Sequence, residues 1–262
     1  MQTLDPEATT FYCATLEELR AREVPFLVGG AYAMERYTDI ARHTGDLDLF
    51  VRPRDYERAL AVLGMMGCQT EVTFPHWLGK AYCGDLYIDL IWSSGNAVAT
   101  VDEGWFTHAV DDEVLGLPVR LCPPEEMIWS KAFVMERERY DGADIVHIVR
   151  ARGRALDWRR LLERFGSHWR VLLSHLVLFG FVYPAECDRV PRWVMRELAG
   201  RLEDETAVPP STEPVCRGTL LSRAQYLVDI ERWGYQDPRL APTGNMTSRE
   251  TALWTAAIDG SR

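Results

Sequence analysis

Residues 26–51 read FLVGGAYAMERYTDIARHTGDLDLFV, and this stretch decides the fold of the N-terminal half. Its apolar start ends at Gly29-Gly30, which predicts a short strand running into a tight turn. Residues 31–40 then have a helical pattern, and residues 47–51 form a second apolar strand before Pro53. The order of strand, glycine turn, helix and strand is typical of an α/β domain.

The glycine pair is a candidate for binding phosphate. Glycines at a strand-to-helix turn let backbone N–H groups approach a phosphate closely, and the helix N-terminus adds a favourable dipole. The alternative is a turn that binds nothing, which Gly29-Gly30 alone does not exclude.

Two acids alternate with leucines in the second strand. Residues two apart on a strand share a face, so Asp46 and Asp48 point the same way while Leu47 and Leu49 pack into the core. Neighbouring carboxylates repel each other, and a bound divalent cation removes that cost. The alternative is a solvated edge strand, which the apolar neighbours disfavour. The pair therefore predicts a metal site.

A third acid, Asp89, lies in the middle of the apolar run Leu86–Trp92. A lone carboxylate in such a run is costly unless it is paired or binds a metal. The alternative is that Asp89 faces solvent at a sheet edge. Gly84-Asp85 before this run predicts a hairpin with residues 82–83.

The composition excludes several classes of protein. The chain has 262 residues, 47% of them hydrophobic, so it can bury a sizeable core and is neither disordered nor a small disulfide scaffold. Its net charge of −10 disfavours broad nucleic-acid binding, which needs a basic surface. An anionic partner is expected to arrive with a metal ion.

The cysteines and apolar runs predict a cytoplasmic protein with no membrane partner. The six cysteines are far apart, which is typical of free thiols in a reducing compartment. Their spacing does not match that of the ligands of a zinc site. The N-terminus lacks the basic start of a secretory signal. The most apolar run, Val171–Tyr183, is shorter than the about 20 residues that span a bilayer.

The pattern changes from mixed to helical near Pro123. We expect an α/β core over residues 1–122 and a mainly helical region over residues 123–262, with a proline-rich linker at 203–216. The first helix of that region is predicted to run from Pro123 to Arg139. The acids at 111–113 are expected in a solvated turn.

The combined pattern resembles the nucleotidyltransferase superfamily, which has the DNA polymerase β-like fold. The resemblance rests on Gly29-Gly30, on Arg42-His43-Thr44-Gly45-Asp46-Leu47-Asp48 and on Asp89. It continues through the helix that carries Lys131 and through residues 137–145, which are similar to uncharacterised and AbiEii-type nucleotidyltransferases. The "GGxA" start is similar to the branch of antibiotic-modifying enzymes. The resemblance covers about residues 24–150.

The resemblance implies a mixed sheet with flanking helices, an α-helical C-terminal region, and a Mg²⁺-dependent enzyme. The reaction is attack of an acceptor hydroxyl on the α-phosphorus of an NTP, helped by two Mg²⁺ or Mn²⁺ ions. Asp46, Asp48 and Asp89 would be the catalytic and metal-binding residues. The implied nucleotide-binding residues are Gly29, Gly30, Arg42, Thr44 and Lys131.

The acceptor is left open by the sequence. A small-molecule hydroxyl is the leading expectation, and a toxin-like enzyme acting on protein or tRNA is the second. A non-catalytic nucleotide-binding module is the third, although such a module has no reason to keep three costly acids. For Lys131 the alternative is a surface lysine with a solvated ammonium.

Overall fold

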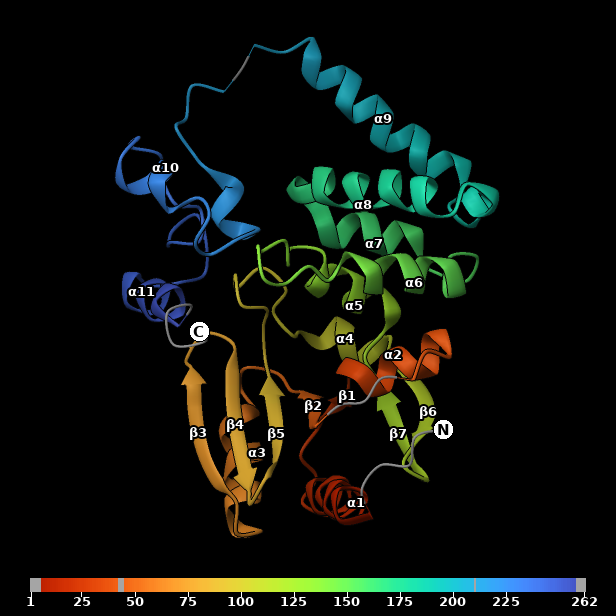
Figure 1. The fold of residues 1–262 in the computed structure, drawn as a ribbon, viewed down its shortest axis with the longest axis vertical. Coiled ribbons are helices and arrows are strands. Elements are labelled where there is room, and N and C mark those ends of the chain that lie inside the picture. Colours follow the sequence, from red (N-terminus) through yellow and green to blue (C-terminus); the bar gives the residue numbers. More distant parts are fainter. Residues whose placement is uncertain (1–5, 42–44, 210, 258–262) are drawn as a thin grey trace. The chain divides into compact units, whose positions relative to one another are not determined.

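A computed structural model describes residues 6–41, 45–209 and 211–257 of the chain (Figure 1). The chain forms two compact units. The first unit contains Met1–Pro123 together with Ser248–Trp254. The second unit contains Pro124–Thr247 and Thr255–Arg262.

A seven-stranded mixed sheet forms the centre of the first unit, which confirms the predicted α/β class. The strands follow the order β3-β4-β5-β2-β1-β7-β6. Strand β2 is parallel to β5, and β1 is parallel to β7, whereas the other neighbours are antiparallel. The strand bounds are β1 Leu27–Val28, β2 Asp46–Phe50, β3 Gln69–Phe74, β4 Leu78–Cys83, β5 Leu86–Ile91, β6 Val110–Val114 and β7 Leu117–Leu121.

The two strands that carry the predicted site are interior strands. Strand β2 lies between β5 and β1, and β5 lies between β4 and β2. Leu47 and Leu49 are fully buried, as the alternation predicts, and so are Ile88 and Leu90 of β5. Because neither strand is an edge, the alternative of acids on a solvated sheet edge is wrong for both.

Helices pack on the sheet of the first unit. Helix α1 is amphipathic and buries one side, including Tyr12, Leu16 and Leu19. The short helix α2 begins at Gly30, directly after β1. The helix bounds are α1 Pro6–Ala21, α2 Gly30–Thr38, α3 Tyr56–Met65 and α4 Glu103–Thr107.

The C-terminal helix α11, Ser248–Ala256, also contributes to the first unit. Its Trp254 ring packs edge-on against Phe74 and Trp77, with ring centroids 4.9 and 5.2 Å apart. Gly95 leaves room for this ring, since a Cβ there would lie 2.5 Å from it. The aromatic cluster therefore joins residues about 180 positions apart in sequence.

The second unit is mainly helical, which confirms the predicted α-helical C-terminal region. Helix α5 ends at Lys131, so the prediction that it continues to Arg139 is wrong. The chain turns back here, and Met135 and Tyr140 form an antiparallel bridge. The helix bounds are α5 Pro124–Lys131, α6 Gly142–Arg152, α7 Trp158–Phe165, α8 Trp169–Val182, α9 Arg192–Thr206 and α10 Leu227–Glu231.

Helices α7 and α8 lie in the one stretch of the described residues that is long and apolar enough to be a candidate membrane span. By length and composition alone, Trp158–Val182 is long enough to cross a membrane, a test that core helices of water-soluble proteins also pass. The stretch is not one continuous helix, because Gly166 has a φ of +46° between α7 and α8. Its buried side chains include Trp158, Phe165 and Trp169.

Cys68 and Cys83 form a disulfide, so the prediction of six free thiols is wrong. Strands β3 and β4 pair with Gln69 opposite Tyr82, which places the two cysteines opposite each other at the next position. The other four cysteines form no disulfide in the described part of the chain. Cysteine usage therefore no longer supports a reducing compartment.

The acids at residues 111–113 belong to strand β6 and not to a turn. Strand β6 is an edge strand that pairs with β7, so most of its side chains face solvent and acids are tolerated there. Asp112 accepts a hydrogen bond from the Arg36 guanidinium at 2.6 Å.

Candidate active site

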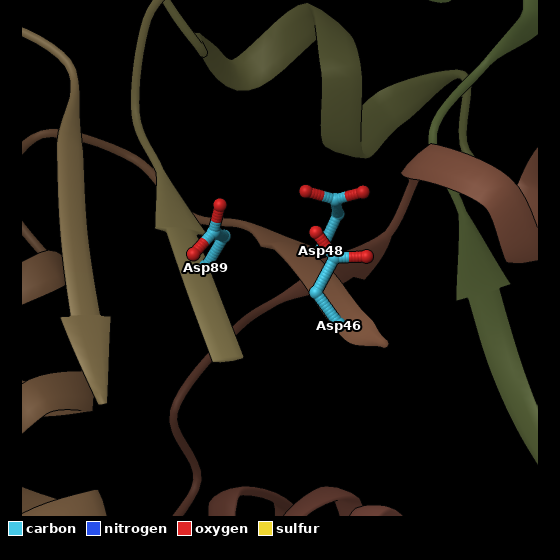
Figure 2. Close-up of side chains that lie close together, drawn as sticks. All are labelled: Asp46, Asp48 and Asp89. Atoms are coloured by element: carbon cyan, nitrogen blue, oxygen red, sulfur yellow. The ribbon is translucent and has the colours of Figure 1, made fainter. Parts of the chain in front are cut away.

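Asp46, Asp48 and Asp89 meet on one face of the sheet (Figure 2). The parallel register of β2 and β5 places Asp48 beside Asp89 and Asp46 beside Tyr87. One carboxylate oxygen from each aspartate lies within 4.8 Å of the others. All three side chains are partly exposed, so a ligand can reach them from solvent.

The glycine turn lies against this carboxylate cluster. Gly30 has a φ of +53°, and a Cβ there would lie 1.7 Å from Oδ2 of Asp48. At Gly29 a Cβ would lie 2.3 Å from the Phe50 ring. The N–H of Gly29 donates to the carbonyl of Asp48 at 3.0 Å. Both glycines are therefore required by the close approach of the turn to β2.

A lysine that sequence reasoning did not place at the site lies beside Asp89. Strand β4 pairs with β5 so that Lys80 is opposite Asp89, and Nζ of Lys80 donates to Oδ1 of Asp89 at 2.6 Å. Burial raises the pKa of Asp89, the Lys80 ammonium counteracts this, and the charge of Asp46 adds to the increase. An ionised Asp89 is thus stabilised by its positive neighbour.

Tyrosines surround Asp46, and the sequence analysis did not identify them. The hydroxyl of Tyr87 lies 3.5 Å from Oδ2 of Asp46. Burial and the charge of Asp46 raise the pKa of Tyr12 to about 12, and burial together with the charges of Tyr12 and Asp46 raises the pKa of Tyr32. Tyr87 could have been identified from the sequence, because it is two residues before Asp89 and shares its face.

Lys131 has carboxylate partners within the second unit. Its Nζ lies 3.1 Å from Oδ2 of Asp141 and 2.8 Å from Oδ2 of Asp144. The Arg139 guanidinium also donates to Asp141. The side chain of Lys131 is 19% exposed, so it is not a lysine with a freely solvated ammonium. Asp141 and Asp144 stand at the start of α6.

Two predicted nucleotide-binding residues, Arg42 and Thr44, lie outside the described residues.

The donor set of the aspartate cluster fits a divalent cation. Three carboxylate oxygens lie close enough together to bind the same ion. Carboxylate oxygens are hard donors, which Mg²⁺ and Mn²⁺ prefer. The raised pKa of Asp89 shows that its negative charge is costly in this place, and a bound cation would relieve that cost.

The mixed sheet with flanking helices, the glycine turn and the acidic cluster define a nucleotidyltransferase-type fold. The chain belongs to the family described as uncharacterised nucleotidyltransferase, which matches residues 13–177. This confirms the resemblance seen in the sequence and the predicted class of enzyme. A search of curated proteins finds no match.

Solved structures of two antibiotic-modifying proteins are similar to the chain. The antibiotic-resistance factor ANT(2″)-Ia in solution is 18% identical with a TM-score of 0.44, over 70% of this chain and 97% of that chain. A crystal structure of ANT(2″)-Ia with adenylyl-2″-tobramycin is 20% identical with a TM-score of 0.43, over 67% and 98%. The lincomycin-bound lincosamide antibiotic adenylyltransferase LnuA is 13% identical with a TM-score of 0.40, over 56% and 98%.

Proposed function

We propose that this nucleotidyltransferase transfers an NMP group from an NTP to the hydroxyl of a small molecule, with Mg²⁺ held by Asp46, Asp48 and Asp89. The observation that carries the proposal is the meeting of these three carboxylates, within 4.8 Å, on interior strands beside a glycine turn. Membership of the nucleotidyltransferase family supplies the class of reaction.

The pair Asp46 and Asp48 has a different role from Asp89 in the proposed reaction. Asp46 and Asp48 would hold two ions, and Asp89 would hold the acceptor-side ion and accept the proton of the acceptor hydroxyl. When bound, Mg²⁺ (or Mn²⁺) would neutralise charge on the attacking and leaving oxygens. The acceptor oxygen forms a bond to the α-phosphorus, the bond from that phosphorus to the bridging oxygen breaks, and pyrophosphate leaves.

Other residues of the chain are proposed to bind the nucleotide. Gly29 and Gly30 would place the start of α2, with its backbone N–H groups, near the β- and γ-phosphates. Arg42 and Thr44 precede the aspartate strand in sequence and are proposed as further contacts. Lys131 would contribute a positive charge to the triphosphate.

The acceptor is proposed to be a small molecule because the net charge of −10 disfavours a polyanion such as tRNA. Tobramycin and lincomycin are the first compounds to assay, since the similar structures of ANT(2″)-Ia and LnuA contain adenylyl-2″-tobramycin and lincomycin. We place the reaction in the cytoplasm, where NTPs are available.

The test combines metal binding with transfer. We expect calorimetry to show that NTP binding needs Mg²⁺ and is lost when Asp46 and Asp48 are both changed to Asn. Equal affinity in the presence of EDTA would exclude the metal site. Transfer of label from α-labelled NTPs to extract components then identifies the acceptor, and label on protein or tRNA would favour the toxin-like alternative.

Asp89→Asn separates chemistry from binding. We expect this variant to keep most of its affinity for Mg·NTP and to slow transfer by about 10²–10⁴-fold, as for the loss of a positioned base. A thermal melt checks that the variant folds. A variant with unchanged transfer would remove Asp89 from the mechanism.

A further inference from the structure

Lys80 is a positive group in direct contact with Asp89 of the aspartate cluster. The chain has two lysines, Lys80 and Lys131, and the second belongs to the other unit. Lys80 and Asp89 are directly opposite on antiparallel strands β4 and β5, and their side chains are only 20% and 15% exposed. The ion pair is therefore partly shielded from solvent, and its charge acts more strongly than that of a surface pair.

A second contact fixes the position of this ammonium group. Nζ of Lys80 lies 4.7 Å from the centroid of the Tyr87 ring, over its face. The hydroxyl of Tyr87 in turn lies 3.5 Å from Oδ2 of Asp46. The lysine is thus held between Asp89 and an aromatic ring that reaches the neighbouring aspartate, so its charge stays beside the cluster.

We propose that Lys80 is a positioning residue that acts as an internal cation of the aspartate cluster. It holds Asp89 in place and weakens the binding of a divalent ion there until a triphosphate is bound. The proposal rests on the proposed function, because it takes Asp46, Asp48 and Asp89 as the metal ligands.

The physical basis is the charge of the cluster. Each ionised carboxylate of the cluster carries one negative charge, and the adjacent ammonium of Lys80 offsets the charge of Asp89. An ion on Asp89 would share its ligand with the ammonium and be repelled by it. A triphosphate adds several negative charges that offset this repulsion. Metal binding should therefore depend strongly on the triphosphate, and this dependence should come from Lys80.

The experiment is a titration with Mn²⁺, followed by the electron paramagnetic resonance signal of the free ion. It is done with and without inorganic triphosphate, so that the identity of the base is irrelevant. Without triphosphate, we expect Lys80→Met to bind Mn²⁺ at least about tenfold more tightly than the wild-type protein. The increase in Mn²⁺ affinity on adding triphosphate should be smaller in Lys80→Met by the same factor. Lys80→Arg keeps the charge and should restore wild-type behaviour.

Two controls assign the effect to the contact with Asp89. Arg22→Met removes one positive charge from an exposed position of the first unit and should leave Mn²⁺ binding unchanged. In an Asp89→Asn background, Lys80→Met should give no increase in Mn²⁺ affinity. Lys80→Gln also removes the charge and replaces Lys80→Met if thermal melts show that the latter does not fold.

The outcomes separate the inference from the proposed function. If Asp46→Asn/Asp48→Asn abolishes Mn²⁺ binding but Lys80→Met leaves the affinity unchanged or lower, the inference is wrong and the metal site stands. If the Asp46→Asn/Asp48→Asn variant binds Mn²⁺ as tightly as the wild-type protein does, the proposed function is wrong and the inference is overturned with it.

Discussion

Gly30→Ala is expected to disable the site through the shape of the turn, with no charge removed. The new Cβ would lie 1.7 Å from Oδ2 of Asp48 and 2.8 Å from its Cβ. Rotating the Asp48 side chain can move the oxygen but not the Cβ, which is fixed by the backbone of β2. The turn and the strand must therefore separate, and the Asp48 carboxylate must leave its place beside Asp46 and Asp89.

The expected loss of stability has two parts. Gly30 has a φ of +53°, and placing an L-residue in the left-handed region costs about 1–2 kcal/mol. Overpacking a closely packed position costs typically about 1–3 kcal/mol more. Gly116 offers a matched control, because its φ is +79° and a Cβ there would meet no atom of the described residues within 4 Å. Gly116→Ala should show the backbone cost alone.

The assay is chemical denaturation together with Mn²⁺ titration of both variants. We expect Gly30→Ala to lose about 2–5 kcal/mol of unfolding free energy and at least tenfold in Mn²⁺ affinity. Gly116→Ala should lose about 1–2 kcal/mol and keep its metal affinity. Equal stability of the two variants, with unchanged Mn²⁺ binding in Gly30→Ala, would refute the close approach of the turn to Asp48.

Three further outcomes are expected. Asp237→Asn should cost about 3–5 kcal/mol, because it leaves Arg239, 1% exposed, without its carboxylate partner. Burial acts to raise the pKa of Asp237, but its bonds with Arg239 outweigh this and lower it, so this stabilisation is present above the usual pKa near 4 and is lost as pH falls below it. Reduction of the Cys68–Cys83 disulfide should cost about 3 kcal/mol, given a sequence separation of 15. Lys131→Ala should weaken the binding of a triphosphate more than that of the matching monophosphate.

Matched variants check these three outcomes. Asp188→Asn breaks an ion pair that is about two-thirds exposed, so urea denaturation should show a much smaller loss than for Asp237→Asn. The melting temperature of Cys68→Ser/Cys83→Ser should be the same with and without dithiothreitol. If dithiothreitol also leaves the melting temperature of the wild-type protein unchanged, the disulfide is contradicted. Equal weakening of both nucleotides in calorimetry would mean that Lys131 acts through the fold.

The α/β core could be predicted because its signals are local. The alternation of Asp46, Leu47, Asp48 and Leu49 fixes which side chains share a face before any partner strand is known. The glycine pair is also a local signal, because it marks the end of the preceding strand without any knowledge of the partner strand. What the sequence does not contain is the order of strands, which places β2 beside β5 and so brings Asp89 to the pair.

Lys80 could have been found by extending one predicted hairpin. A two-residue turn at Gly84-Asp85 sets Cys83 opposite Leu86, and counting back along both strands sets Lys80 opposite Asp89. The disulfide could not have been found this way. Strands β3 and β4 change register between Val72 and Phe74, so counting from their turn gives the wrong partner for Cys68.

The contact of Trp254 with Phe74 and Trp77 makes the middle of the chain an insertion. The chain leaves the first unit at Pro123 and returns to it at Ser248, so a fragment ending at Pro123 would expose this aromatic cluster. A truncation from the C-terminus that removes Trp254 would expose the rings of Phe74 and Trp77 in the same way.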